Sequence, residues 1–165
     1  MALSSESNSL LNLDNIMNLR NGRVGIVYTE WNDKIVAEQI EGAKRIATLT
    51  NNQITKIVKV PGSFEIPFAC KALHDATFQD DDNPNAIIAF GAVIRGGTPH
   101  FEYVSQAVTE GITQLNLILP IPVIFGVLTL DTEEQAWERL GGNHGHKGEE
   151  AMIAALKMIK MKQSL

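Results

Sequence analysis

The chain is poor in cysteine, which limits the chemistry that it can support. Cys70 is the only cysteine among 165 residues, so no disulfide can form within the chain and no cluster of thiolates is available to a metal. It lies in an apolar helical pattern, and we predict that it fills space in a core. A chain without disulfides suits a reducing compartment, so we expect a cytoplasmic protein.

Long apolar and long basic runs are also missing. No segment approaches the roughly 18 apolar residues of a membrane span, and the first residues lack a basic region followed by an apolar one. We therefore expect no association with a membrane. The formal net charge of -5 argues against a nucleic-acid surface, although an acidic chain can still carry a local cationic pocket.

Aromatic residues make up only 6% of the chain, but the hydrophobic content of 44% is enough for the core of one domain. Four apolar segments predict buried strands, and each is followed by a helical pattern. The expected strands are Arg23–Thr29, Ile54–Val60, Ala86–Phe90 and Val123–Leu128. The first expected helix is capped by Asn32 or Asp33 and runs to about Leu49. The others run from Phe64 to Thr77, from His100 to Leu117, briefly before Gly141, and from Lys147 onward.

This alternation of strands and helices is typical of right-handed βαβ units. We predict an α/β protein with three layers, in which helices cover both faces of a four-stranded parallel sheet. Residues 23–165 are expected to form this domain. Residues 1–22 are expected to form an N-terminal arm that is partly disordered or packed on a neighbouring subunit.

A glycine-rich segment, Gly91 to Val104, follows the third expected strand and leads into a helix. Such a junction gathers free backbone N–H groups at the positive end of a helix dipole, which favours an anion such as phosphate. The segment departs from a P-loop because Gly97 replaces the lysine, so a bound phosphate needs a cation from elsewhere. His100 can exchange protons beside this turn. The alternative is an ordinary glycine-rich turn with a surface histidine.

Ligands of open parallel sheets bind beyond the carboxyl ends of the strands, so the residues after each strand are candidates. Trp31 follows the first strand, where its ring would either stack on a flat heterocycle or fold back on its own helix. Glu65 follows the second strand. It would either accept hydrogen bonds from ligand hydroxyl or amino groups or only complement the start of a helix.

Two cations can replace the missing lysine of the glycine-rich turn. Arg139 suits a phosphate better than Lys147, because a guanidinium binds two oxygens at once, but either can also be an ordinary charge near a helix end. His144 and His146 form an H-x-H pair in a glycine-rich loop. Without a carboxylate or cysteine partner this pair is a weak zinc signal.

Five ordered motifs together resemble the 6,7-dimethyl-8-ribityllumazine synthase family over roughly residues 23–160. They are Trp31-Asn32-Asp33, Pro61 to Pro67, Gly91 to Val104, Pro122 to Thr129, and Gln135-Ala136 through Arg139 to Lys147-Gly148. The resemblance implies a flavodoxin-like fold. It also implies condensation of 5-amino-6-(D-ribitylamino)uracil with 3,4-dihydroxy-2-butanone 4-phosphate, without a metal or redox cofactor.

The resemblance also implies a role for each matching residue. His100 would be the acid/base, Trp31 would stack on the pyrimidine and Phe125 would close the pyrimidine pocket. The remaining aminouracil contacts would be Ser63, Phe64, Glu65, Ala92, Val93 and Ile94. The phosphate contacts would be Gly97, Thr98 and Arg139, with Asn32, Gly96 and Lys147 as further candidates.

The resemblance implies homopentamers with active sites between subunits, or an icosahedral shell of about 60 subunits built from such pentamers. The resemblance therefore implies small-molecule substrates, other copies of this chain, and riboflavin synthase as a candidate partner. Three rivals stay open. They are a flavodoxin-like phosphate-binding module, a lumazine- or flavin-binding relative without catalysis, and a purely structural shell.

Overall fold

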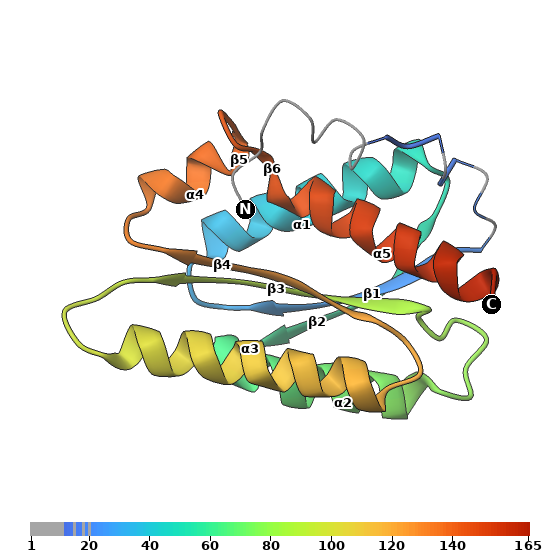
Figure 1. The fold of residues 1–165 in the computed structure, drawn as a ribbon, viewed down its shortest axis with the longest axis horizontal. Coiled ribbons are helices and arrows are strands. Elements are labelled where there is room, and N and C mark those ends of the chain that lie inside the picture. Colours follow the sequence, from blue (N-terminus) through green and yellow to red (C-terminus); the bar gives the residue numbers. More distant parts are fainter. Residues whose placement is uncertain (1–11, 15, 18, 20) are drawn as a thin grey trace.

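A four-stranded parallel sheet forms the centre of the computed structural model, which describes residues 12–14, 16, 17, 19 and 21–165. The strands are β1 (Arg23–Thr29), β2 (Gln53–Val60), β3 (Ala86–Ile94) and β4 (Val123–Leu130), in the order β2-β1-β3-β4 (Figure 1). All neighbours are parallel. The predicted α/β, flavodoxin-like sheet is confirmed.

Helices cover both faces of this sheet (Figure 1). On one side lie α1 (Asp33–Leu49), α4 (Glu134–Glu138) and α5 (Lys147–Gln163). On the other side lie the 3₁₀ turn η2 (Ser63–Glu65), α2 (Ile66–Thr77) and α3 (His100–Ile118). In the described part of the chain, no helix combines the length and hydrophobicity that a membrane span requires.

The two faces of β3 are buried in two different apolar clusters. Ile88 and Phe90 pack in the cluster shared with α1 and α5, whereas Ile87 and Ala89 pack in the cluster shared with α2 and α3. Each large side chain buried in this way contributes about 1.5–3 kcal/mol. This two-sided burial is the reason that the third strand is a continuous apolar run rather than an alternating one.

The expectation that β3 ends at Phe90 is wrong, because the strand continues to Ile94. Ala92 to Ile94 pair in register with Leu128 to Leu130, and β4 is correspondingly two residues longer than expected. Gly91 is therefore a strand residue and not the start of a turn. A Cβ at Gly91 would lie 2.9 Å from Ser63 Oγ, so the glycine permits close packing of η2 on β3.

A short antiparallel hairpin follows α4 and was not expected. Its strands are β5 (Leu140–Gly142) and β6 (Gly145–His146). Gly141 and Gly145 have φ angles of 112° and 74°, which favour glycine. The glycine content predicts only a loop, and strands of two or three residues leave no periodic pattern in the sequence.

The expected N-terminal arm lies partly outside the described residues, which omit 1–11, 15, 18 and 20. Of the part that is described, Ile16 and Leu19 are buried in the same apolar cluster as residues of α1 and α5. These two side chains therefore pack on the core of their own chain.

Candidate active site

A cavity of about 590 Å³ opens at the carboxyl ends of β1 and β3. The next strand in the chain, β2, lies on one side of β1, whereas β3 lies on its other side. This is the topological switch point of the sheet, the usual ligand position in such folds, and the volume suits a small molecule. The cavity is lined by Trp31, Asn32, Pro61, Gly62, Ser63, Phe64, Glu65, Ala92, Val93, Ile94, His100 and Val104. Nine residues that the sequence nominated for the site thus come together.

The loop that carries Trp31 is held by its neighbours on both sides. Thr29 Oγ1 donates a hydrogen bond to the carbonyl of Trp31 at 3.2 Å, and Asn32 Nδ2 donates to the carbonyl of Ala92 at 2.8 Å. Asn32 was expected to be one of two caps for α1, but its side chain makes no capping hydrogen bond. It instead ties β1 to β3 across the switch point. The Trp31 side chain is left 74% exposed, with its ring at the cavity.

Gly62 brings the ring of Trp31 and the carboxylate of Glu65 close to each other. A Cβ at Gly62 would lie 3.2 Å from Glu65 Oε2 and 3.6 Å from Trp31 Cδ1. Glu65 belongs to the 3₁₀ turn η2 rather than to the first turn of α2. The flat ring and the acceptor carboxylate therefore share one wall of the cavity.

A second, open hollow of about 320 Å³ lies beside His100 at the start of α3. It is lined by Arg95, Gly96, Gly97, Thr98, Pro99 and Glu102. No heavy atom lies within 4 Å of a Cβ built on Gly96 or Gly97, so the backbone here is accessible to a ligand. Because α3 begins at His100, this hollow receives the N–H groups at the positive end of the helix. His100 itself lines the larger cavity next to it.

Arg95 is a cation of this hollow that the sequence reasoning missed, although it directly precedes the glycine pair. Its Nε donates to Asp131 Oδ1 at 2.8 Å, its Nη1 donates to Glu102 Oε1, and its guanidinium lies 4.1 Å from the centre of the Phe101 ring. Hydrogen bonds to Asp131 and Glu102 raise the pKa of Arg95, and the Arg95 hydrogen bond lowers the pKa of Glu102. Arg95 therefore places a guanidinium at the edge of the hollow, but its charge is paired with two carboxylates, so an anion bound here still needs the backbone N–H groups and a cation from elsewhere.

Three nominated residues line neither cavity: Phe125, Arg139 and Lys147. Phe125 is 42% exposed on the edge strand β4 and pairs with Ala89, three residues and about 10 Å before the cavity residue Ala92. Arg139 ends α4, where its Nη1 donates to the carbonyl of Gln135 at 3.4 Å. Lys147 begins α5 and pairs with Glu150 at 2.7 Å.

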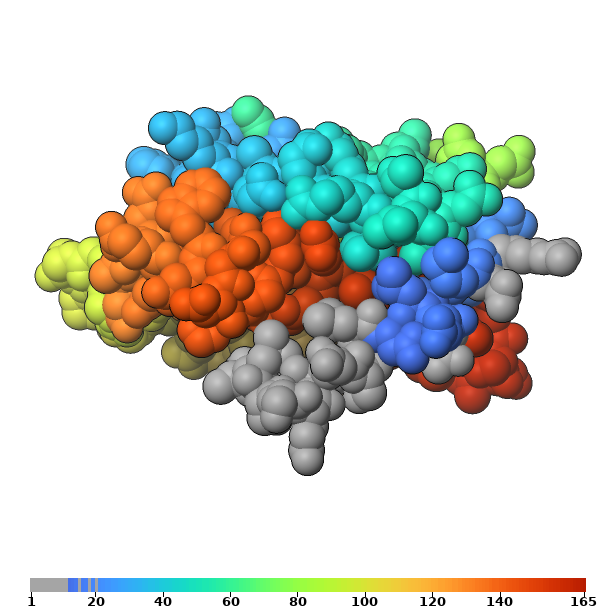
Figure 2. All heavy atoms as spheres, turned by 90° about the horizontal axis from the view of Figure 1, so that it is seen from above, coloured from blue at the N-terminus to red at the C-terminus, as the bar shows by residue number. Residues whose placement is uncertain are grey.

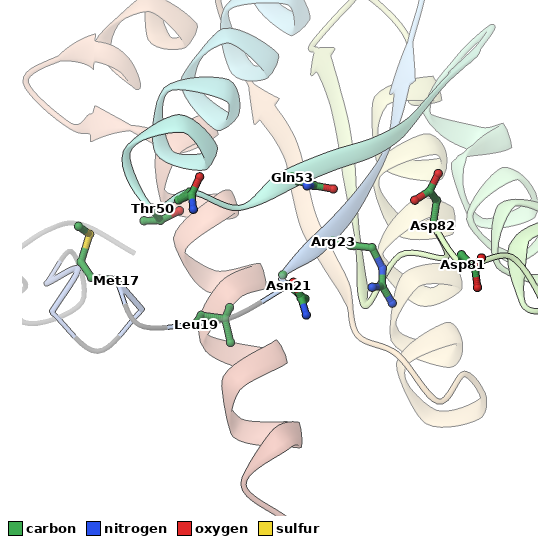
Figure 3. Close-up of a pocket in the computed structure, with 10 residues that line it drawn as sticks. Met17, Leu19, Asn21, Arg23, Thr50, Gln53, Asp81 and Asp82 are labelled. Atoms are coloured by element: carbon green, nitrogen blue, oxygen red, sulfur yellow. The ribbon is translucent and has the colours of Figure 1, made fainter.

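A larger concavity of about 720 Å³ lies at the opposite, amino-terminal end of the strands (Figure 3). In Figure 3 its side chains are spread apart, with Met17 and Leu19 on one side and Asp81 and Asp82 on the other. Its cation is already engaged, because Arg23 donates to the carbonyl and the side-chain oxygen of Asn83. We therefore place the functional site at the cavity of about 590 Å³ at the carboxyl ends of the strands, where aromatic, acidic and imidazole groups converge.

Among the described residues, no group of three or more His, Cys, Asp or Glu side chains is arranged to hold a metal ion. The two histidines of the H-x-H pair lie in different surroundings. The side chain of His144 is 46% exposed, whereas that of His146 is 8% exposed and contacts Glu38.

Comparison with known proteins assigns the chain to a family. The family model described as 6,7-dimethyl-8-ribityllumazine synthase matches residues 21–163. A protein of that name from Parabacteroides distasonis is 40% identical over 163 residues, covering 96% of this chain and 98% of the relative. A protein of the same name from Porphyromonas gingivalis is 45% identical over 145 residues, covering 86% of each chain. A third, from Phocaeicola vulgatus, is 40% identical over 169 residues and covers 100% of this chain and 96% of the relative. The chain therefore belongs to the 6,7-dimethyl-8-ribityllumazine synthase family.

Proposed function

We propose that this chain condenses 5-amino-6-(D-ribitylamino)uracil with 3,4-dihydroxy-2-butanone 4-phosphate to give 6,7-dimethyl-8-ribityllumazine, phosphate and water. The observation that carries the proposal is the pairing of two adjoining cavities at the switch point. One is lined by a flat indole ring, a carboxylate and His100, and the other has open backbone N–H groups in the residues that directly precede His100. A heterocycle and a phosphate ester bound in these two places would meet at the imidazole.

The larger cavity is assigned to the aminouracil. Trp31 stacks on the pyrimidine, because its ring borders the cavity with most of its surface free. Ser63, Phe64 and Glu65 hold the ribityl chain, whose hydroxyl groups can donate to the carboxylate. Backbone groups of Ala92 to Ile94 contact the ring from the end of β3.

The smaller hollow is assigned to the phosphate of the butanone. Backbone N–H groups at Gly97 and Thr98 and the positive end of α3 bind its oxygens, with Gly96 beside them. This phosphate becomes the leaving group, so the same charges that bind it also stabilise it as it departs.

The reaction needs proton transfers and no oxidant. The 5-amino group attacks the ketone carbon, and loss of water gives an imine. Elimination then breaks the carbon–oxygen bond to phosphate, and attack by the ribityl-bearing nitrogen closes the ring with loss of water. His100 accepts and returns the protons, while the two cavities hold the reactants in contact.

We further propose that each site is completed by a second copy of the chain within a homopentamer. Phe125, Arg139 and Lys147 lie outside the cavities of their own chain, and Phe125 is exposed on an edge strand. In this arrangement the neighbour's Phe125 covers the pyrimidine and its Arg139 neutralises the phosphate, with Lys147 nearby. Large exposed apolar side chains on α2 and α3, such as Phe68, Tyr103 and Leu117, support an interface on that face. The pentamer, or a shell built from pentamers, would work in the cytoplasm, and riboflavin synthase is a candidate partner.

The purified protein tests the reaction directly. Both substrates are mixed with it, and lumazine formation is followed by absorbance and by phosphate release. Turnover in a stoichiometric ratio of lumazine to phosphate supports the proposal. Tight binding of lumazine or flavin without turnover would instead indicate a binding protein. Assembly of the chain without turnover and without binding of lumazine or flavin would indicate a structural shell. Native mass spectrometry separates a pentamer from a shell.

A further inference from the structure

His146 is a buried imidazole that the proposed reaction does not use. Its side chain is only 8% exposed, whereas that of His144, two residues earlier in the same hairpin, is 46% exposed. A buried polar ring requires partners for its nitrogens, and the partners of His146 indicate what it does.

Both ring nitrogens of His146 are hydrogen-bonded. The backbone N–H of Glu149 donates to Nδ1 at 3.3 Å, so Nδ1 carries no proton and the ring caps the start of α5. The proton of the neutral ring is therefore on Nε2, which lies 3.1 Å from Glu38 Oε1 and donates to it. His146 thus joins the first turn of α5 to α1.

The groups that face this ring form a closed network of charges. Arg45 of α1 donates from Nε to Glu149 Oε1 at 2.9 Å and from Nη1 to Glu38 Oε1 at 3.2 Å. The hydrogen bond that His146 donates lowers the pKa of Glu38, and the hydrogen bond that Arg45 donates to Glu149 raises the pKa of Arg45. These interactions are partly exposed, so each pair alone contributes little, but together they define the position of the ring.

The backbone of α1 packs closely against one side of the ring. A Cβ at Gly42 would lie 2.2 Å from His146 Cε1, and a Cβ at Gly148 would lie 2.1 Å from the carbonyl oxygen of Gln39. Figure 2 shows the segment around residues 131–147, in orange, against α1 in blue to cyan. The end of the hairpin and the first turn of α5 therefore pack closely on α1, through contacts at His146, Gly42 and Gly148.

The same hairpin carries the two cations that lie outside the cavities. His146 pairs with Leu140 across the hairpin; Arg139 directly precedes Leu140 and Lys147 directly follows His146, so both lie at the base of its two strands. The N–H of Lys147 also donates to the carbonyl of Arg139 at 2.8 Å. Any shift of the His146 ring would therefore move both cations together relative to α1.

We propose that His146 is a positioning residue for phosphate binding: through Glu38 and Glu149 it fixes the hairpin that presents Arg139 and Lys147. This inference rests on the proposed role of Arg139 at the phosphate of a neighbouring copy. It predicts that a change at His146 acts on one of the two substrates, although the residue touches neither.

The test compares His146→Ala with His146→Asn in the assembled enzyme. We expect His146→Ala to raise the KM for the butanone phosphate by about tenfold, because small displacements of binding groups are costly. The KM for the aminouracil should change by less than about twofold, since the Trp31 wall is untouched. Asparagine can still accept from the N–H of Glu149 and donate toward Glu38, so His146→Asn should recover most of the affinity. His144→Ala, in the exposed half of the hairpin, is the matched control and should resemble the wild type.

Glu38→Ala provides a second route if His146→Ala does not fold. Glu38 is about one-third exposed, so its removal creates no cavity, yet it deletes the acceptor of Nε2. We expect a smaller rise in the same KM.

Two results would overturn the positioning role, provided that Arg139→Ala does raise the KM for the phosphate substrate. One is that His146→Ala changes the KM values for both substrates equally. The other is that neither His146→Ala nor Glu38→Ala changes the KM for the butanone phosphate. If Arg139→Ala leaves that KM unchanged, the proposed phosphate role of Arg139 is wrong, and the inference about His146 is wrong with it.

Discussion

Asn32 Nδ2 donates a hydrogen bond to the carbonyl oxygen of Ala92 at 2.8 Å, and this bond spans the switch point of the sheet. Asn32 has φ 58° and ψ 44°, a left-handed conformation that asparagine tolerates better than most residues. The residue therefore meets two requirements at once. It turns the chain sharply between β1 and α1, and it fixes the Trp31 loop to the strand that lines the site.

Replacing Asn32 by alanine and by glycine separates these requirements. Asn32→Ala should destabilise the protein by about 2 kcal/mol, from strain at positive φ together with the lost hydrogen bond. Asn32→Gly removes only the hydrogen bond and should cost about 1 kcal/mol. Both variants should raise the KM for the aminouracil, because both release the Trp31 loop. Urea unfolding and steady-state kinetics measure the two effects, and equal stability of the variants would show that the backbone conformation carries no strain.

His100→Ala tests how much of the rate comes from proton transfer. We expect kcat to fall by about 10²- to 10⁴-fold while turnover remains detectable, because an amine and a ketone condense readily once they are held together. Circular dichroism should show an unchanged fold, since His100 is exposed at the start of α3. Complete loss of turnover in a folded protein would mean that the imidazole contributes more than orientation does.

Cys70 predicts a specific response to alkaline pH. Burial raises the pKa of its thiol to about 12, whereas the thiol of an unfolded chain titrates near pH 8.5. The raised pKa means that the associated stability is complete below about pH 8.5 and is lost as the pH rises toward 12. Relative to Cys70→Ala, the wild type should lose up to about 1.4 kcal/mol of unfolding free energy per pH unit above pH 9. Parallel pH profiles of the two proteins would contradict this.

Parts of the site could be predicted from the sequence because they depend on local patterns. The apolar run from Ala86 predicts a buried parallel strand, and the carboxyl ends of parallel strands share one edge. Trp31, Glu65 and His100 were therefore expected to lie together, and the structure places all three around one cavity. Composition around His100 likewise predicted the start of a helix, which is observed.

Other features depend on packing between distant segments and leave no such pattern. The extension of β3 to Ile94 depends on pairing with Leu128 to Leu130 of β4. Arg95 gains significance only when Asp131 and Glu102 are brought to it by two other elements. His146 looked like a weak metal ligand, because the sequence gives no sign that Glu38, 108 residues away, lies against its ring.

Gly42→Ala tests the close contact between α1 and the ring of His146. A Cβ at this position would lie 2.2 Å from Cε1 and 2.5 Å from Nδ1 of His146, and 3.0 Å from the backbone nitrogen of Glu149. Alanine favours helix by about 1 kcal/mol over glycine, but overpacking should outweigh this and give a net loss of about 1–2 kcal/mol. The double variant Gly42→Ala/His146→Asn should lose less than the sum of the single variants, because asparagine leaves room for the methyl group. Additive losses, measured by thermal unfolding, would show that the ring and Gly42 are not in contact.

Mixed assemblies test whether two copies share a site. Trp31→Ala damages the half that lines the cavity, and Arg139→Ala damages the half that we assign to the neighbour. If every site combines halves of two chains, an assembly of both variants contains some sites with neither change. Random mixing at equal amounts makes about a quarter of the sites intact.

Co-expression with two different affinity tags allows mixed assemblies to be isolated by purification on both tags in turn. At limiting concentrations of both substrates, we expect their rate per site to recover toward about a quarter of the wild-type value, with a wild-type KM for the butanone phosphate at the restored sites. The control combines Trp31→Ala with Glu65→Ala, two changes in the same half, which should give no recovery because every site retains one of them. Recovery confined to the first pair requires Arg139 to act across the subunit boundary. Absence of recovery in a verified mixed assembly would instead place Trp31 and Arg139 at the site of a single chain.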